Sequence, residues 1–238
     1  MNIVKLVLIV SFGMMLAGCQ EEFFEITEPD TTTTFFADDT ISDLILKVTL
    51  KDGSFDNIID QCSETSIDFP YMVKVRNEII QIDSGEDIEM LAQQHLQVRK
   101  NLRINFPVTV TFSDYTTSVL NNRGELQQIQ NRYRHRLKDD DIECIDFVYP
   151  VAISLYDTQY QKQESKWAGS DKEMHGIVKG KKEVIIEIGY PVVLEKADGI
   201  TIEVTNNAEL ENAIIQSMGT CDENDEVEFD DEDHFGNA

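Results

Sequence analysis

The sequence contains few of the residues on which common catalytic and metal-binding motifs depend. Its 238 residues include 4 cysteines, 4 histidines, 12 glycines and 1 tryptophan. No Cys-x-x-Cys, His-x-x-His or His-Glu-x-x-His spacing occurs, which excludes the usual zinc-binding sequences. No Gly-x-Ser-x-Gly sequence or glycine-rich phosphate loop occurs either, which excludes common serine-hydrolase and nucleotide-binding signatures. We therefore predict that the chain is not an enzyme and has no cofactor, with calcium as the one candidate.

Basic residues are also scarce. Lys and Arg together number 20 against 45 Asp and Glu, which gives a formal net charge of −25. A field of this sign repels nucleic-acid phosphates, so we expect no nucleic-acid partner. Hydrophobic residues make up 41% of the chain, which is enough for a core, and the length allows one large or two small domains.

An aromatic–proline pair followed by an apolar run occurs four times. The intervals between successive prolines are 37, 43 and 41 residues, and a period in this range indicates a repeated supersecondary unit. Because the missing N–H of proline costs least at the start of a strand, each pair is predicted to open one. The four pairs are Phe69-Pro70, Phe106-Pro107, Tyr149-Pro150 and Tyr190-Pro191.

A helix-start signal follows each pair after a second apolar segment. It consists of Ser or Asn, two spacers, an acid and an apolar residue, a pattern typical of a capping box at a helix N-terminus. Each unit is therefore predicted to run strand, strand, helix. The four signals are Ser84…Asp87-Ile88, Asn122…Glu125-Leu126, Ser170…Glu173-Met174 and Asn206…Glu209-Leu210.

These signals predict an α+β fold of four ββα repeats forming two modules, each an antiparallel sheet with helices on one face. Two units are paired because four antiparallel strands can bury one face under two helices. The first module is placed at 61–140 and the second at 141–221. The predicted strands are 67–75, 78–83, 104–112, 115–120, 147–156, 163–168, 184–194 and 199–205, and the predicted helices are 85–98, 123–137, 171–179 and 207–218.

Residues 1–18 resemble the signal peptide of a bacterial lipoprotein. Their apolar core is too short for a stable membrane span. Leu16, Ala17, Gly18 and Cys19 resemble the lipobox, which implies cleavage before Cys19 and lipid attachment to it. An ordinary secretory signal with a chance cysteine is the alternative.

Two further segments are expected to lie outside the modules. Residues 19–60 are predicted to be the lipidated N-terminus and a tether, which is flexible at 20–40, where threonines and acids are frequent. Within this segment, Ile41 to Leu50 could be a helix or a strand. Residues 222–238 are predicted to be an acidic tail.

Several stretches resemble uncharacterised surface lipoproteins of flavobacteria, which are Bacteroidota. Besides the four units, the resemblance rests on residues 52–60, 144–150, 206–211 and 221–223. The acidic run Gln20-Glu21-Glu22 also resembles the surface-export signal of Bacteroidota lipoproteins, although a solvated tether would have the same composition. The resemblance implies a lipid-anchored protein of the outer membrane that faces the cell surface, and it implies no activity.

Three cysteines remain besides Cys19. Cys144 opens the predicted second module and Cys221 closes it, so in an exported protein they form a natural disulfide pair. A Cys62–Cys144 pairing is the alternative, since spacing does not fix connectivity. The family resemblance implies a partner cysteine for Cys62 near the end of the unit-two helix, and this chain has none there. Cys62 is therefore left free, paired with one of the other two, or paired between molecules.

Two acidic stretches alternate oxygen-bearing side chains as calcium loops do. They are Asp52-x-Ser54-x-Asp56 and, in the tail, Asp222, Asn224, Glu226 and Glu228. Because both lack the glycine of such loops, turn formation and solvated acid are the alternative interpretations.

Two groups of residues are candidates for ligand contact. Trp167 could stack on a sugar, with packing as the alternative. Arg132, Arg134 and Arg136 belong to the one basic cluster of the sequence and could contact an anionic glycan, with the protein's own acids as the alternative partner.

The predicted function is a non-enzymatic surface lipoprotein that acts as a binding or adhesion module for a glycan or protein ligand and is held to the membrane by its lipid. One alternative is a structural or assembly component of the bacterial outer envelope. The other is a polysaccharide-acting hydrolase, which would require two carboxylates converging in a cleft.

Overall fold

A computed structural model of the chain describes residues 30–94, 102–133, 141–180 and 183–221. Within these ranges the fold is α+β with four small antiparallel sheets, which confirms the predicted class. The helices are α2 (Thr40–Val48), the 3-10 helix η2 (Ser54–Asp56), α3 (Asn57–Asp60), α4 (Gly85–Gln94), α6 (Arg123–Tyr133), α7 (Asp171–Val178) and α8 (Asn207–Ser217). The strands are β1 (Thr34–Phe36), β2 (Thr65–Ile67), β3 (Tyr71–Val75), β4 (Glu78–Ile82), β5 (Leu102–Ile104), β6 (Val108–Phe112), β7 (Thr117–Leu120), β8 (Ile145–Phe147), β9 (Val151–Tyr156), β10 (Lys162–Ala168), β11 (Ile185–Gly189), β12 (Val192–Lys196) and β13 (Thr201–Val204).

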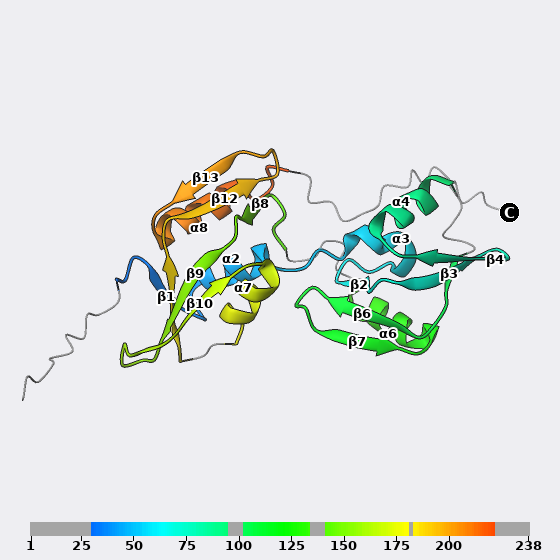
Figure 1. The fold of residues 1–238 in the computed structure, drawn as a ribbon, viewed down its shortest axis with the longest axis horizontal. Coiled ribbons are helices and arrows are strands. Elements are labelled where there is room, and N and C mark those ends of the chain that lie inside the picture. Colours follow the sequence, from blue (N-terminus) through cyan, green and yellow to red (C-terminus); the bar gives the residue numbers. More distant parts are fainter. Residues whose placement is uncertain (1–29, 95–101, 134–140, 181–182, 222–238) are drawn as a thin grey trace, which may run out of the picture.

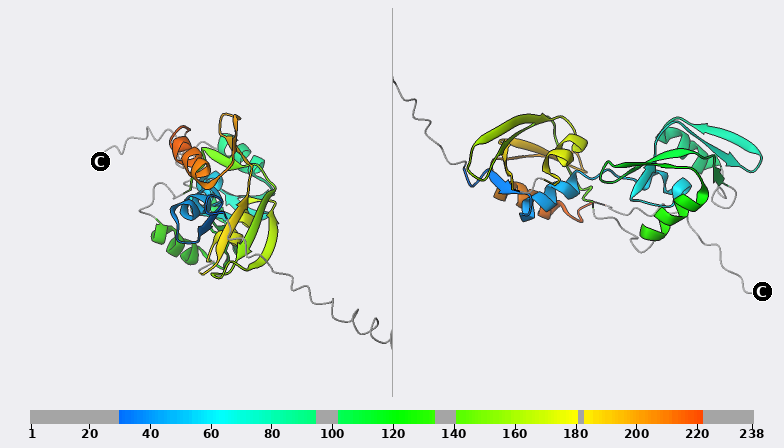
Figure 2. Two further views of the ribbon diagram at one scale, coloured as in Figure 1. Left: turned by 90° about the vertical axis from the view of Figure 1, so that its left-hand side faces the viewer. Right: turned by 90° about the horizontal axis from the view of Figure 1, so that it is seen from below.

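The described residues form two modules that lie side by side (Figures 1 and 2). The first contains η2 to α6, and the second contains β1, α2 and β8 to α8. Each module has its own hydrophobic core, one around Val73 and Val110 and the other around Ile153 and Leu194. At the contact between them, Lys179 Nζ lies 2.6 Å from Asp114 Oδ2.

Four antiparallel hairpins, each followed by a helix, occur in order along the chain. Hairpin β3–β4 precedes α4, β6–β7 precedes α6, β9–β10 precedes α7, and β12–β13 precedes α8. In β9, buried residues alternate with partly exposed ones, as expected of a strand with one face on the core. The second strand of each hairpin is the edge of its sheet.

Each predicted first strand is divided in two at its aromatic–proline pair. Pro70, for example, separates β2 from β3, and all four aromatic–proline peptide bonds are cis. Proline has no N–H with which to continue the ladder. The short strand before the proline instead pairs with the hairpin of the other unit of its module: β2 with β6, β5 with β3, β8 with β12 and β11 with β9. Each module consequently has two small sheets, and our prediction of one sheet per module was wrong.

The helix-start signals at Asn122, Ser170 and Asn206 form the predicted side-chain caps, whereas the Ser84 hydroxyl donates to Asp87 Oδ2. At α8, the Thr205 N–H donates to Glu209 Oε2 at 2.7 Å, and the Glu209 N–H donates to Asn206 Oδ1 at 3.0 Å. The corresponding acids of the other three units also accept hydrogen bonds from the backbone before their helices. The apolar residue after each acid is buried: Ile88, Leu126, Met174 and Leu210.

The second module also uses its aromatic–proline tyrosines to hold helix starts. Tyr149 Oη donates to Asp171 Oδ1 at 2.6 Å, and Tyr190 Oη donates to Asn207 Oδ1 at 2.7 Å. Asp171 and Asn207 are the first residues of α7 and α8. In each unit of the second module, the tyrosine therefore connects the start of the hairpin to the helix that follows it.

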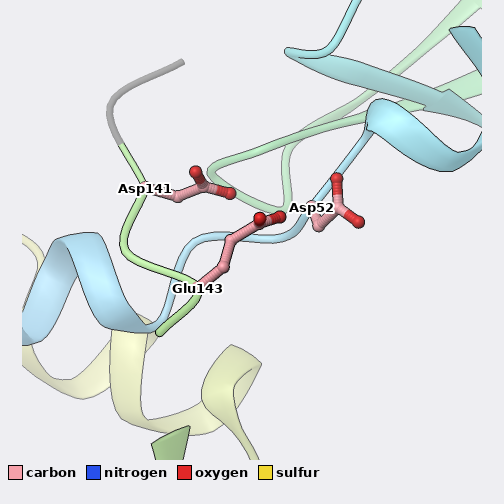
Figure 3. Close-up of side chains that lie close together, drawn as sticks. All are labelled: Asp52, Asp141 and Glu143. Carbon is pink, nitrogen blue, oxygen red and sulfur yellow. The ribbon is translucent and has the colours of Figure 1, made fainter. Parts of the chain in front are cut away.

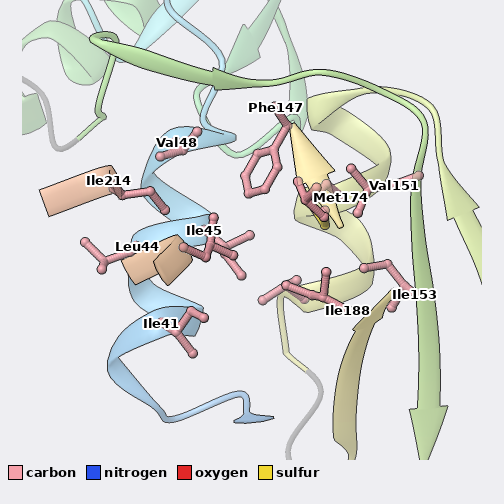
Figure 4. Packing of buried hydrophobic residues seen from close by; sticks show 14 of the residues in the cluster. Ile41, Leu44, Ile45, Val48, Phe147, Val151, Ile153, Met174, Ile188 and Ile214 are labelled. Carbon is pink, nitrogen blue, oxygen red and sulfur yellow. The ribbon is translucent and has the colours of Figure 1, made fainter. Parts of the chain in front are cut away.

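Residues 30–60, which we predicted to be part of a tether, are folded. Strand β1 pairs with β11, and one face of α2 lies in the core of the second module through Ile41, Ile45 and Val48 (Figure 4). The second module is thus discontinuous in sequence, because the first module lies between α2 and β8. The prediction was wrong because Ile41, Leu44, Ile45 and Val48 have helical spacing and form an apolar face, which outweighs the linker-like threonines and acids around them.

Cys144 and Cys221 form a disulfide in the structure, with an S–S distance of 2.11 Å. Cys62 is buried and free, so the alternative Cys62–Cys144 pairing is not the one formed. The bond attaches the chain just after α8 to the start of β8, and thereby joins the two ends of the continuous part of the second module.

We expect Asn206→Ala to lower the free energy of unfolding by about 1 kcal/mol, because the first turn of α8 loses its side-chain cap. Urea unfolding measures the change. Asn212→Ala, at an exposed position inside the same helix, is the matched control and should be neutral or slightly stabilising. Equal effects of the two substitutions would contradict a capping role.

We expect Ile45→Ala to lower the free energy of unfolding by about 2–5 kcal/mol, because it opens a cavity in the second core. Ile45 has an exposed fraction of 0%. Lys47→Ala, two residues along the same helix, should have little effect. If thermal unfolding shows Ile45→Ala to be as stable as Lys47→Ala, α2 is not part of that core.

Candidate ligand-binding site

The first unit departs from the other three around its aromatic–proline pair. The residue after the proline is valine in the other units, at Val108, Val151 and Val192, but it is tyrosine at Tyr71. Phe69, before the proline, has an exposed fraction of 38%, whereas its three counterparts are only partly exposed. Two aromatic rings are therefore built into the start of this hairpin.

Three aromatic rings lie against one another at this place, and we call them the aromatic platform: Phe55, Phe69 and Tyr71. The Phe69 and Tyr71 rings are stacked with centroids 5.7 Å apart, and the Phe55 and Phe69 centroids lie 6.1 Å apart. Tyr71 is buried at 5% exposure, whereas Phe55 is 40% exposed. The platform thus rests on the core through Tyr71 and presents two phenylalanine rings to solvent.

Lys51 lies against the Phe55 ring of the aromatic platform. Its Nζ lies 5.4 Å from the centroid of the Phe55 ring, a cation–π geometry, and donates a hydrogen bond to Ser66 Oγ. Burial lowers the pKa of Lys51, and the surrounding carboxylates, first among them Asp56, oppose that effect. The ammonium group is therefore already engaged within the module.

A cleft of about 410 Å³ lies beside the aromatic platform, between the starts of β3 and β6. Both prolines of the first module line it, because the exchange of β2 and β5 brings the two aromatic–proline pairs together. Asp68 and Thr109 supply polar groups, and the Asp68 carboxylate is fixed by a 2.6 Å hydrogen bond from Thr111 Oγ1. The lining residues are Asp68, Phe69, Pro70, Tyr71, Pro107, Val108, Thr109 and Val119.

Two carboxylates are buried in the core of the first module. Asp56 and Asp60 have exposed fractions of 0%. Asp56 Oδ2 accepts from the Ile67 N–H at 2.7 Å, and the two Asp60 oxygens accept from the Cys62 N–H and the Thr65 hydroxyl. Because neither side chain reaches solvent, this pair cannot serve as the acid and base of a hydrolase acting on a polymer.

Burial also keeps protons on these acids. It raises the pKa of Asp56 to about 7, with opposing effects from the Ile67 hydrogen bond and the Lys51 charge. Burial raises the pKa of Asp60 well above its usual range, and the charge of Asp56 adds to the rise. Among the described residues, Asp56 Oδ1 and Tyr71 Oη have no hydrogen-bond partner. Burial therefore favours the protonated form of both carboxyl groups and raises the pKa of each.

Three other carboxylates meet between the two modules (Figure 3). Asp52 lies on the segment that leaves α2, whereas Asp141 and Glu143 lie on the segment that returns to β8, with ligand oxygens within 4.8 Å of one another. Oxygen ligands of this kind suit calcium. Asp141 and Glu143 also interact with other groups of the protein, so their oxygens are not reserved for an ion.

The structure brings Cys144 and Cys221 together, whereas the two described candidates for ligand contact, Trp167 and Arg132, lie in different modules. Trp167 is 69% exposed on edge strand β10, and Arg132 is exposed on α6. Asp52 Oδ1 accepts from the Ser54 N–H at 2.6 Å and Asp56 is buried in the core, where its Oδ2 accepts from the Ile67 N–H, so both carboxylates have hydrogen bonds within the protein. Arg134, Arg136, the lipobox residues Leu16 to Cys19, and the tail candidates Asp222, Asn224, Glu226 and Glu228 lie outside the described residues.

Comparisons with protein-family models, with curated proteins and with solved structures find no match to this chain. In the part of the chain that the structure describes, no helix has the length and apolar character needed to cross a membrane. The site must therefore be interpreted from its own chemistry.

Sequence reasoning did not identify the aromatic platform as a site. Phe69 was recognised only as part of the repeat, and Phe55 was not singled out. The available signal was the departure of the first unit from its repeat at Tyr71.

The stability of the first module should fall as the pH rises toward and through 7. The folded protein holds the Asp56 proton more tightly than the unfolded chain does, so this contribution is complete below about pH 4 and is lost as the pH passes about 7. Asp56→Asn, which mimics the protonated acid, should flatten this dependence in urea unfolding between pH 5 and 8. The exposed Asp38→Asn is the control, and an unchanged slope in Asp56→Asn would contradict the assignment.

Proposed function

We propose that the protein is a lipid-anchored, exported binding protein that has no enzymatic activity and presents its modules outside the cell. The observation that carries the binding role is the aromatic platform beside the cleft of the first module. Ligand sites commonly combine apolar and aromatic walls with a few fixed polar groups, and the cleft has this composition through Phe69, Asp68 and Thr109.

Two further features support export and anchoring. The Cys144–Cys221 disulfide is the kind of bond that persists in oxidising compartments. Leu16-Ala17-Gly18-Cys19 has the form of a lipobox, and two or more acyl chains on one residue would anchor the protein stably. The proposed location is the outer membrane of a Bacteroidota cell, with the membrane contacted through lipid.

In this proposal the four hairpin–helix units are repeats of one structural unit, and only the first of them has acquired a ligand site. The second module keeps its two tyrosines on helix starts and holds the fold together through α2 and the disulfide. Calcium remains a prediction for the acidic tail.

Cys19→Ala should abolish labelling of the protein by an alkyne-modified palmitate in growing cells, because the acceptor thiol is lost. On intact cells expressing the unmodified chain, added protease should digest the modules without prior lysis, and lysed cells provide the control. Cys62→Ala is the matched cysteine control and should be labelled normally. Labelling of Cys19→Ala would contradict the anchor, and protection from protease until lysis would contradict the outward orientation.

A further inference from the structure

We propose that the aromatic platform and the adjoining cleft bind a neutral saccharide, with Phe69 as the stacking surface and Asp68 as the acceptor for sugar hydroxyl groups. The inference rests on the proposed binding function and names its ligand class. The site lies in the first module, away from Trp167, at a repeat motif that the sequence did not indicate as a ligand contact.

The aromatic platform has the form that a stacked sugar requires. The flat Phe69 ring is supported from below by the buried Tyr71 ring, stacked at an interplanar angle of 11°, and flanked by Phe55. Such support fixes the orientation of an exposed ring before any ligand arrives, which lowers the entropic cost of binding. The C–H face of a pyranose is the kind of apolar surface that packs on an aromatic ring, while its hydroxyls remain available for hydrogen bonds.

The polar groups beside Phe69 match sugar hydroxyls. Asp68 is the residue before Phe69. One oxygen of its carboxylate accepts from Thr111 Oγ1, and its backbone N–H donates to the Thr109 carbonyl at 2.9 Å. The carboxylate is thus a fixed acceptor at the edge of the ring. Thr109 lines the same cleft and can both donate and accept.

The negative charge of the cleft and of the chain favours a neutral sugar over an acidic one. Asp68 lines the cleft, and the whole chain has a formal charge of −25, so a uronic or sulfated sugar would be repelled. The nearby cation, Lys51, is directed to Ser66 and the Phe55 ring. A ligand that offers hydroxyl groups and no anionic group satisfies these constraints.

The repeat provides an internal comparison. In the second module, the aromatic residues that correspond to Phe69 are tyrosines whose hydroxyls are committed to Asp171 and Asn207. Phe69 has no hydroxyl and faces solvent next to a cleft. The same position therefore supports a helix start in the second module, whereas in the first module it packs on the core at Phe106 and is available for stacking at Phe69.

The test is calorimetric titration of the full mature chain with laminarihexaose, cellohexaose, mannohexaose and xylohexaose, with a hexaguluronate as the anionic comparison. We expect at least one neutral hexasaccharide to bind. Phe69→Ala should weaken that binding by about tenfold or more, and Asp68→Asn should weaken it while leaving the aromatic platform intact. Phe36→Ala, a phenylalanine of similar exposure at 42% in the second module, is the matched control and should bind normally.

These outcomes distinguish a failure of the saccharide site from a failure of the proposed function. Equal binding by the unmodified chain and by the Phe69→Ala and Asp68→Asn variants would overturn the site while leaving a saccharide-binding protein. Binding of hexaguluronate alone, or of none of the hexasaccharides, would overturn the neutral-saccharide assignment. Lipid labelling and protease accessibility do not depend on this ligand, so the anchored, exported role would be judged separately.

Discussion

The pairing of each short strand with the hairpin of a neighbouring unit is the interaction on which each module depends. Strand β2 joins β6 and β5 joins β3, so neither unit of the first module has a complete sheet without the other. Small sheets of two strands are marginal alone, and the third strand with a packed helix supplies the missing stability. The same exchange sets Pro70 and Pro107 on opposite sides of one cleft. The candidate site is therefore a product of the pairing that holds the module together.

The discontinuous second module constrains the first at both ends. One connection leaves α2, whose apolar face is fixed in the second core, and the other returns to β8, where Cys144 is bonded to Cys221. The carboxylates of Asp52, Asp141 and Glu143 lie along these connections. The turn of β6–β7 also reaches α7, where the Tyr115 and His175 rings meet edge to face with centroids 5.7 Å apart. These contacts orient the first module on the second.

The core of the first module contains two buried acids, and burying them has a free-energy cost. Asp56 and Asp60 accept hydrogen bonds from the Ile67 N–H and the Thr65 hydroxyl of β2 and from the Cys62 N–H that follows α3, so these buried donors are paired. The charge of Lys51 lowers the pKa values of both carboxyl groups, but burial outweighs this effect and favours their protonated forms. Tyr71 connects this region to the aromatic platform, because its ring stacks on Phe69 and its hydroxyl, whose pKa is raised first by burial, also feels the charges of Asp56 and Asp60.

Local sequence determined the elements, and tertiary contacts decided their partners. The spacing of Asn206 and Glu209, and of the equivalent pairs, determined where helices begin, because capping involves atoms within a few residues. The α+β class also followed from residue order, whereas residue order favoured the Cys144–Cys221 pair and left the Cys62–Cys144 pairing open until the structure showed which bond forms. The exchange of strands at each proline, the inclusion of α2 in the second core and the meeting of Phe55 with Phe69 did not follow, because strand pairing and side-chain packing join residues far apart in the chain and leave no local pattern.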